Sequence, residues 1–412
     1  MSKKVLVIGG GPAGIIAAAT ASKKGNKVIL LDKNSIIGKK MLITGNGRCN
    51  ITNNCEIEDL IENVTRNRNF LYSSFYSFSN KDIIDILQKY DVEIKVENDG
   101  RCFPKSDKSI DVTNALKTYL LDNGVILSLN CNVINVEKYK NKFITEYTKN
   151  NRKEIIESDS LIIATGGKSY PSTGSTGDGY KFGKKFGHNI ISTKPSIVPI
   201  NIKENWIKQN KGLSFKNVKI VLSSDDKIID YEIGDIIFTH FGISGPAIFN
   251  ITSRNNRKIN AKDRFKLDID LFPSLNLKEL DEKIIELLGS NPNKNIINVL
   301  SIILKYNFVL AILNLLQINI SLKASNFTKE HRRKLVRLLK SITLNIADLR
   351  SIEEAYVTSG GIDINQINPS TMESKIVEGL FFCGEVLDVD AYTGGFNLQI
   401  SYSTGYLAGD NQ

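Results

Sequence analysis

The beginning of the chain consists of two apolar runs separated by a glycine-rich break and a helical segment. Residues 5–8 and 28–31 are short, continuous apolar runs, which is the pattern of parallel strands buried on both faces. Residues 15–24 between them are rich in alanine and have helical character. A strand, a turn, a helix and a second strand therefore fit into about 30 residues, as a βαβ crossover requires.

The hydrophobic pattern changes twice farther along the chain. Helical and strand-like segments alternate up to about residue 190, which predicts an α/β domain with a β excursion. Short segments rich in Ile, Val and Phe then predict an antiparallel sheet or barrel, and Leu and Ile at helical spacing follow. Strands and glycines return near the end, so we expect the last segment to rejoin the first domain. The predicted segments are 1–192, 193–274 with about 342–360, 275–341 and 361–412.

Composition indicates an ordinary globular protein of more than one domain. The 412 residues are 41% hydrophobic and 24% charged. The net charge of +10 raises the question of polyanionic partners, but the lysines are scattered rather than gathered in blocks, so nucleic acid is not expected as a partner. No stretch reaches 18 uncharged apolar residues, so neither a transmembrane helix nor a membrane partner is predicted. The oligomeric state stays open.

The cysteines and histidines suggest no redox pair and no metal centre. The five cysteines are an odd number, spread over the chain without a C-x-x-C pair, which favours a reduced, cytoplasmic protein. Cys49 and Cys55 are separated by five residues in the early part of the chain, and we interpret both as packing residues. The three histidines, His188, His240 and His331, are far apart in sequence, so no metal ligands are assigned.

The glycine-rich break carries a dinucleotide-binding fingerprint. Gly9-x-Gly11-x-x-Gly14 follows a strand and opens a helix, and Asp32 ends the next strand. Glycine permits the tight turn and the close approach of a diphosphate, which the helix dipole favours. A carboxylate accepts hydrogen bonds from ribose hydroxyls and repels a 2′-phosphate, so the dinucleotide is FAD or NAD. The residues assigned to this part are Gly9, Gly11, Pro12, Ala13, Gly14, Asp32 and Lys33.

Two later strands favour FAD over NAD. One is apolar and ends in Ala164-Thr165-Gly166-Gly167, a pattern of two-dinucleotide-type flavoproteins. The other ends in Gly384-Glu385, an acid suited to the ribityl chain that only a flavin nucleotide possesses. A helix that starts at Gly395-Phe396-Asn397-Leu398-Gln399 would direct its dipole at the flavin. The chain has one fingerprint only, so NADH or NADPH would bind transiently as a reductant.

Two further loops are richer in glycine than ordinary turns, at 39–50 and 169–180. Backbone that passes close to a flat ring and to phosphates needs such residues. The basic side chains of Lys39, Lys40 and Arg48 would match the phosphate charge, although plain surface positions are the alternative.

Together with these motifs, the runs at 38–53, 169–180, 238–246 and 384–399 resemble the BaiN-like flavoproteins, also called the aminoacetone-oxidase family. The resemblance spans nearly the whole chain in the same order. It implies an α/β fold, with a Rossmann-like FAD-binding domain of the two-dinucleotide-binding type formed by residues 1–192 and 361–412, and with inserted β-barrel and small helical domains. The contacts it adds to FAD are at Lys39, Lys40, Thr44, Gly45, Gly47, Arg48, Cys49, Asn50 and Val133. Asn46 and Ala391 stand where many relatives have glycine.

The expected reaction is hydride transfer through flavin N5 to or from a small organic substrate. The resemblance implies either NAD(P)H-dependent reduction of an activated C=C bond or oxidation of a small amine by oxygen. A tRNA-modifying flavoprotein and an FAD-binding regulator without turnover are further alternatives. Tyr170, His240 and Tyr392 are candidate proton donors by their motif positions, with a structural role as the alternative for each.

Overall fold

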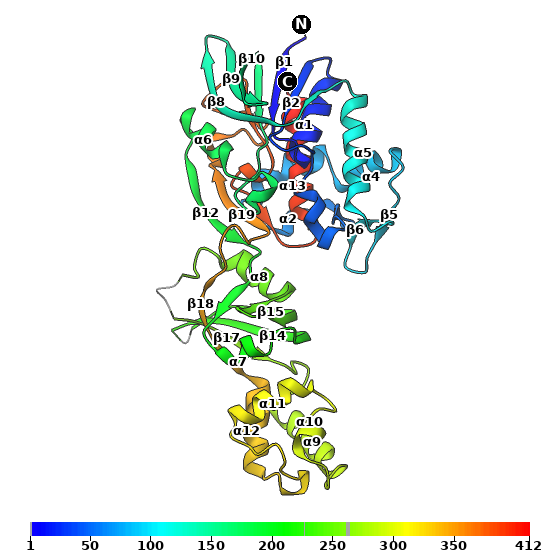
Figure 1. Ribbon diagram of the computed structural model, residues 1–412, viewed down its shortest axis with the longest axis vertical. Coiled ribbons are helices and arrows are strands. Elements are labelled where there is room, and N and C mark those ends of the chain that lie inside the picture. Colours follow the sequence, from blue (N-terminus) through cyan, green and yellow to red (C-terminus); the bar gives the residue numbers. More distant parts are fainter. Residues whose placement is uncertain (1, 226, 261–263) are drawn as a thin grey trace. The chain divides into compact units, whose positions relative to one another are not determined.

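The chain divides into two compact units. The computed structural model describes residues 2–225, 227–260 and 264–412. One unit comprises Met1–Ser196 and Ile352–Gln412, and the other Ile197–Ser351 (Figure 1). Each has a hydrophobic core of its own, so each is described by itself.

The first unit is built on a five-stranded parallel sheet. Its strands lie in the order β20 (Leu380–Phe382), β11 (Ser160–Ile163), β1 (Lys4–Ile8), β2 (Lys27–Leu31) and β7 (Ile126–Ser128). Every neighbouring pair is parallel, and β1 at the centre is buried over Val5–Ile8, as its unbroken apolar run predicts. Helix α1 (Pro12–Lys23) connects β1 to β2 and packs on both strands, which confirms the predicted βαβ unit.

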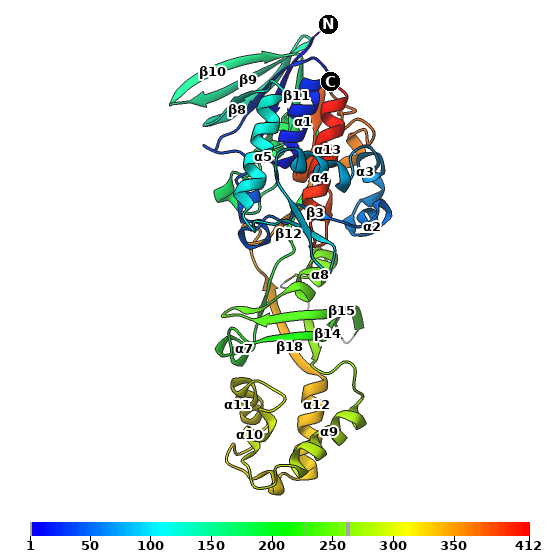
Figure 2. The same ribbon diagram turned by 90° about the vertical axis from the view of Figure 1, so that its right-hand side faces the viewer.

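The C-terminal segment completes the first unit. Strand β20 forms the edge of the parallel sheet beside β11, and helix α13 (Phe396–Asp410) packs against α1 (Figures 1 and 2). The two helices come close because α13 carries glycine at the contact: a Cβ on Gly405 or Gly409 would overlap the carbonyl oxygens of Ala13 and Ala17. The structure places Ile352–Gln412 in the same unit as the beginning of the chain.

Smaller sheets and helices surround this centre. The antiparallel sheets are β10 (Arg152–Ser158), β9 (Lys142–Lys149) and β8 (Cys131–Tyr139); β3 (Thr52–Asn53), β6 (Arg101–Pro104) and β5 (Ile94–Val96); β21 (Asp390–Ala391) and β4 (Val64–Arg66); and β12 (Ile190–Ser196) and β19 (Val357–Ile362). The helices are α2 (Ile57–Glu62), α3 (Tyr72–Ser77), α4 (Asn80–Lys89), α5 (Ser109–Asp122) and α6 (Asp178–Lys185). Strands β5 and β6 form an antiparallel hairpin.

The second unit combines a barrel with helices. The closed barrel has the order β13 (Ile200–Ile202), β16 (Gly242–Ser244), β15 (Lys227–Phe238), β14 (Ser214–Ser224), β17 (Phe265–Asp270) and β18 (Ile342–Leu349). Its helices are α7 (Asn205–Gln209), α8 (Pro246–Asn255), α9 (Leu277–Gly289), α10 (Ile296–Leu300), α11 (Tyr306–Leu315) and α12 (Lys329–Lys340). The α/β class with a Rossmann-type sheet, a barrel and helices is confirmed. The barrel and α9–α12 share one core, so their separation into two domains stays a prediction.

Among the described residues, no helix combines the length and the apolar character that a membrane span requires.

Candidate cofactor site

All of the predicted cofactor residues lie in the first unit. They lie at the ends of parallel strands, at the starts of α1 and α13, in the loop at 39–50 and on β8. Gly9 and Gly14 are required by packing within this unit. Gly9 has φ +107°, and a Cβ there would overlap the carbonyl of Ala164 at the end of β11. A Cβ on Gly14 would overlap the carbonyl oxygen of Gly9. Both glycines therefore serve the close approach of strand, turn and helix.

Gly11 differs from its two neighbours in the fingerprint. It is the N-cap of α1 with φ −79°, a conformation open to any residue, and a Cβ on it would meet nothing within 4 Å. Pro12 follows at the first helical position, and the first turn contains no acidic residue. The helix start thus offers unpaired N–H groups, an uncompensated dipole and open space that a side chain would fill. These features fit the diphosphate of a dinucleotide.

Asp32 is held in place by backbone groups on both sides. Its Oδ2 accepts a hydrogen bond from the Gly10 N–H at 2.6 Å, and its Oδ1 accepts from the Asn34 N–H at 2.7 Å and from Asn34 Nδ2 at 3.0 Å. Oδ2 accepts one of these bonds and retains a lone pair, so it can still accept a hydrogen bond from a ribose hydroxyl. Sequence reasoning missed Asn34, although an acid followed two residues later by Asn is typical of an Asx turn.

Lys33 points to the second glycine-rich loop. Its Nζ donates to Asp178 Oδ2 at 2.6 Å and to Thr176 Oγ1 at 2.5 Å. Burial alone would raise the pKa of Asp178, but the hydrogen bonds from Lys33 and Thr176 hold it below its ordinary value. The loop at 169–180 is thereby tied to the end of β2, and the Lys33 ammonium is used for that link.

Glu385 lies in a polar cluster drawn from four distant segments. Its Oε2 accepts from Lys40 Nζ at 2.8 Å, and its Oε1 accepts from Ser169 Oγ at 2.9 Å and from the Thr358 N–H at 2.8 Å. Burial would raise the pKa of Glu385, but the Lys40 charge and these hydrogen bonds hold it below its ordinary value. The carboxylate is therefore ionised and oriented. Ser169 and Thr358 were not assigned from the sequence, since neither motif position signals a partner.

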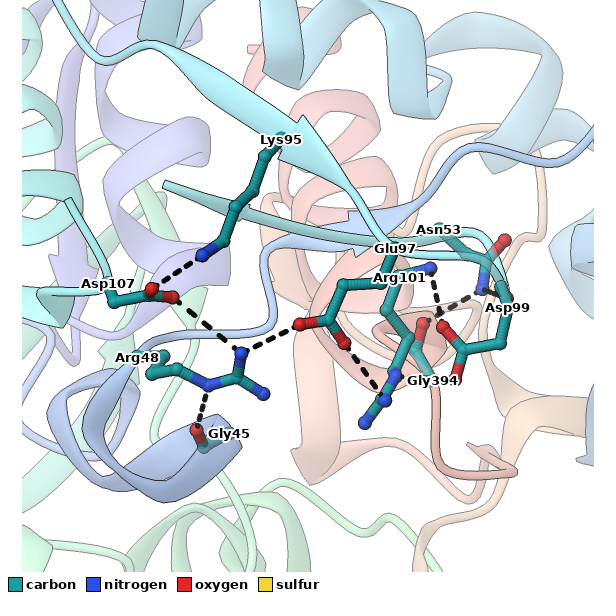
Figure 3. A network of polar contacts seen from close by, with 9 residues as sticks. All are labelled: Gly45, Arg48, Asn53, Lys95, Glu97, Asp99, Arg101, Asp107 and Gly394. Atoms are coloured by element: carbon teal, nitrogen blue, oxygen red, sulfur yellow. Dashed lines mark hydrogen bonds and ion pairs between the residues drawn. The ribbon is translucent and has the colours of Figure 1, made fainter. Parts of the chain in front are cut away.

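The loop at 39–50 is braced by a polar network rather than left free (Figure 3). Arg48 Nη1 donates to Glu97 Oε1 at 2.7 Å, and the guanidinium lies 4.0 Å from the centre of the Phe103 ring. Asn46 adopts φ +58°, the left-handed conformation that asparagine tolerates, which explains how it replaces glycine there. The network orients the loop, and it engages Arg48 with protein partners.

The remaining residues of this loop range from buried to exposed. Thr44 Oγ1 donates to the Met41 carbonyl at 2.8 Å, and Gly45 and Gly47 have positive φ. Cys49 is fully buried, which raises the pKa of its thiol to about 12. All five cysteines are free, including the partly buried Cys55, as expected for packing residues. Lys39 and Asn50 are half-buried.

The A-T-G strand end lies against the fingerprint. Ala164 N donates to the Ile8 carbonyl, and Gly166 has φ +71°. The buried Thr165 Oγ1 has no hydrogen-bond partner among the described residues. Gly167 packs so tightly on Thr358 that a Cβ would overlap its side chain. Val133 is buried on β8.

The start of α13 is a second helix N-terminus without an acidic residue in its first turn. Gly395, its N-cap, has φ +98° and packs on the Thr52 backbone, and Gly384 packs on Ala13. Asn397 braces the preceding turn by donating to the Ala391 and Tyr392 carbonyls. The carboxamide of Gln399 is engaged with protein partners, Thr52 and Ser403 among them, while Phe396 is buried and Leu398 partly so.

Of the three proton-donor candidates, Tyr170 and Tyr392 belong to the first unit and His240 to the second. Tyr170 is half-buried, its ring centre is 6.0 Å from that of Tyr356, and burial raises the pKa of its phenol. Tyr392 is half-buried beside Asn397 in the same unit. His240 is an exposed residue of the second unit, next to Phe241. Each assignment stays a prediction.

Among the described residues, no group of three or more His, Cys, Asp or Glu side chains is arranged to bind a metal ion.

Comparison with known proteins places this geometry in context. The family described as HI0933-like protein Rossmann domain matches residues 3–411. The ribosomal RNA dihydrouridine synthase of Escherichia coli is 29% identical over 402 residues, which are 97% of this chain and 96% of the relative. The 3-dehydro-bile acid delta(4,6)-reductase of Clostridium scindens is 27% identical over 408 residues, 98% of either chain.

Among solved structures, the 3-ketosteroid-delta4-(5alpha)-dehydrogenase from Rhodococcus jostii superposes with a TM-score of 0.53 at 12% identity. The match covers 100% of this chain and 96% of that one. An identity this low shows a shared fold and nothing more.

Proposed function

The chain belongs to the HI0933-like family and is an FAD-dependent oxidoreductase, and on this premise we propose that it reduces a C=C bond conjugated to a carbonyl. The observation that carries the proposal is the chemistry common to two relatives that this chain matches over nearly its full length. A dihydrouridine is a uracil whose C5=C6 bond, conjugated to C4=O, has been saturated. A delta(4,6) reduction of a 3-oxo compound likewise saturates double bonds conjugated to a ketone.

The residues of the first unit would hold the cofactor. The start of α1 at Gly11 would bind the diphosphate, Asp32 the adenosine ribose, and Glu385 the ribityl chain. When bound, FAD supplies two-electron hydride chemistry. The N-terminus of α13 would favour negative charge on a bound ring or on a carbonyl oxygen of the substrate. NADH or NADPH as the source of electrons is part of the proposal.

The chain must also deliver a proton to the carbon next to the carbonyl. A phenol suits this role when it is protonated at neutral pH and half-shielded from water. Tyr170 meets both conditions, because burial raises its pKa above the ordinary value of 10.0. We therefore favour Tyr170 as the donor, with Tyr392 and His240 as the alternatives.

For the substrate class, the proposal is a uracil base in RNA. Its support is the name of the Escherichia coli relative and the net charge of +10, which suits a polyanion. A small conjugated ketone is the second candidate, supported by the bile acid reductase at 27% identity. A cytoplasmic location, expected from the free cysteines, agrees with either substrate.

The test begins with anaerobic titration of the purified FAD protein with NADH and with NADPH. The reduced protein is then mixed either with ribosomal RNA from cells that lack this protein or with a 3-oxo-4-ene steroid. Nucleoside mass spectrometry of the RNA and chromatography of the steroid report a gain of two hydrogen atoms.

Gain of two hydrogens in uridine supports the RNA substrate, and gain in the steroid supports the small ketone. If neither compound is reduced while oxygen and an amine turn the enzyme over, the reductase proposal is abandoned in favour of an amine oxidase.

A further inference from the structure

The net positive charge of the chain lies almost entirely in one unit. Residues 197–351 contain 24 Lys and Arg against 15 Asp and Glu, a net charge of +9. The first unit, with 30 basic and 29 acidic residues, carries a net charge of +1. The unit with the candidate FAD site is thus nearly neutral, and the basic character belongs to the barrel and its helices.

Within the second unit, the charge is concentrated further on α12 and the segment that leads into it. Residues 323–340 contain seven basic residues and one acidic residue, Glu330. Figure 2 shows α12 beside α9, and the two helices are in contact. The apolar side of α12, formed by Leu335, Val336 and Leu339, is buried in the core.

The ion pairs of α12 separate its basic residues into two sets. Arg332 pairs with Asp281, Lys340 with Asp270, and Lys334 with Glu330. These three cations are neutralised by acidic side chains of the same unit.

The other set is the basic stripe, Lys329, Arg333 and Arg337. All three side chains are exposed, and none has an ion pair among the residues that the structure describes. Their spacing of four residues puts them on one side of the helix, about 6 Å apart along its axis. This spacing is comparable to that of successive phosphates on a nucleic-acid strand.

We propose that the basic stripe of α12 is a docking surface for the phosphate backbone of RNA. The inference rests on the proposed reduction of uracil in RNA, and it adds the site that holds the polymer. An anionic membrane is the less suitable occupant, because a helix that lies in a bilayer interface inserts apolar side chains, and those of α12 are buried in the core. Backbone contacts position an RNA without reading its sequence, which is a separate task from recognising the base.

The experiment compares two triple variants of the full FAD protein. One neutralises the stripe with Lys329→Gln, Arg333→Gln and Arg337→Gln. The matched control is Lys117→Gln, Arg152→Gln and Lys153→Gln, three exposed residues of the first unit without an ion pair among the described residues. Both variants lose three positive charges, so any general effect of net charge is equal.

Binding of a fluorescein-labelled RNA hairpin transcribed from ribosomal RNA is measured by anisotropy between about 50 and 200 mM salt. We expect the stripe variant to lower the slope of log affinity against log salt by about 2 and to weaken binding about a hundredfold at 0.1 M salt. The control should match the unaltered protein. FAD content and thermal stability, measured in parallel, show that both variants are folded.

An unchanged slope and affinity in the stripe variant overturn the proposal. So does loss of binding to phosphatidylserine vesicles in that variant while RNA binding stays intact. The proposed function is tested separately. If the RNA is bound through the stripe but its uridines are never reduced, the docking surface is supported and the uracil substrate is rejected.

Discussion

At the scale of residues, the three fingerprint glycines have different physical reasons to be glycine. Gly9 and Gly14 leave no room for a Cβ, because backbone carbonyls occupy that space. Gly11 has ordinary backbone angles and open space where its Cβ would lie. Two of these glycines are therefore required by the fold, whereas the proposed diphosphate contact would account for the third.

This difference predicts opposite effects for two matched substitutions. Gly11→Ala should leave the unfolding free energy of the FAD-free protein within about 1 kcal/mol and weaken FAD binding tenfold or more, about 1.4 kcal/mol. Gly14→Ala should destabilise the FAD-free protein by about 3 kcal/mol or more through overlap with Gly9. Urea unfolding and FAD fluorescence titration measure the two quantities. Equal FAD affinity in Gly11→Ala would show that the diphosphate lies elsewhere.

Asp390 is a second residue with its own consequence. Its side chain is 1% exposed, Ser196 Oγ donates to its Oδ2 at 2.9 Å, and its Oδ1 has no hydrogen-bond partner in the described parts of the chain. Burial raises the pKa of Asp390 to about 6 from an ordinary value of 3.8. The folded state therefore binds more protons than the unfolded state between these values, and its stability falls as the pH rises through them.

Asp390→Asn removes this titration. We expect the stability of the variant relative to the parent protein to rise by about 1 kcal/mol between pH 5 and pH 7. Burial also lowers the pKa of His188, which makes the protein more stable as the pH rises. This contribution is the same in the variant and in the parent, so it cancels when their stabilities are subtracted. Urea unfolding at several pH values measures the difference in unfolding free energy between the variant and the parent. A difference that does not vary with pH would contradict the prediction.

At the scale of elements, ion pairs connect segments that are remote in sequence. The pair of Lys40 and Glu385 joins the loop after β2 to the short turn after β20, and Ser169 adds the loop after β11. The side chains of Lys40 and Glu385 are 21% and 18% exposed, so the pair lies between a surface pair and a fully buried one. It links three of the segments expected to surround the cofactor.

A double-mutant cycle with Lys40→Met and Glu385→Gln should give a coupling energy of about 1–2 kcal/mol at pH 7 in the FAD-free protein. The pKa of Glu385 is lowered in the folded protein, so this stabilisation is present above the ordinary value of 4.5 and is lost as the pH falls through the folded value. Chemical unfolding at pH 7 and at acid pH measures the coupling. A coupling energy near zero at pH 7 would mean that the ion pair does not stabilise the folded protein.

At the scale of the whole molecule, two separate cores suggest two cooperative units. The predicted FAD residues lie in the first unit, whereas Trp206, the single tryptophan, lies in the second. Trp206 packs with Phe238 and Phe308 in the barrel core, with ring centres 6.0 and 6.4 Å away. Tryptophan fluorescence therefore reports on the second unit, and circular dichroism reports on both.

FAD at a hundred times its Kd should stabilise the first unit by about 2.7 kcal/mol, because it binds only the folded form. We expect the corresponding part of the dichroism transition to move to higher urea concentration, while the Trp206 fluorescence transition stays in place. The control is adenosine, which lacks the diphosphate and the flavin. If FAD moves both transitions equally, the two units unfold together.

The sequence by itself determined the features that depend on local physics. The strand, glycine turn and helix of residues 5–31 follow from periodicity and from the steric freedom of glycine, so they are legible without the rest of the fold. The fold class, the type of cofactor and the return of the C-terminal segment were predicted for the same reason, since each is signalled by a continuous run of residues in the sequence.

Only the tertiary structure decided which remote side chains meet. The partners of Glu385 come from positions 40, 169 and 358, which are 345, 216 and 27 residues away. No local sequence pattern encodes such pairings, because the tertiary packing decides which segments meet. The fold likewise engaged Arg48 with a protein partner, although its position in a basic loop had indicated a phosphate contact. It also engaged Lys33, which the sequence assigned to the dinucleotide fingerprint, with Asp178. The scattered positive charge was visible in the sequence, but the concentration of net positive charge in one unit required the unit boundaries. The three cations on one side of α12 that have no ion pair among the described residues were identified only from the ion pairs.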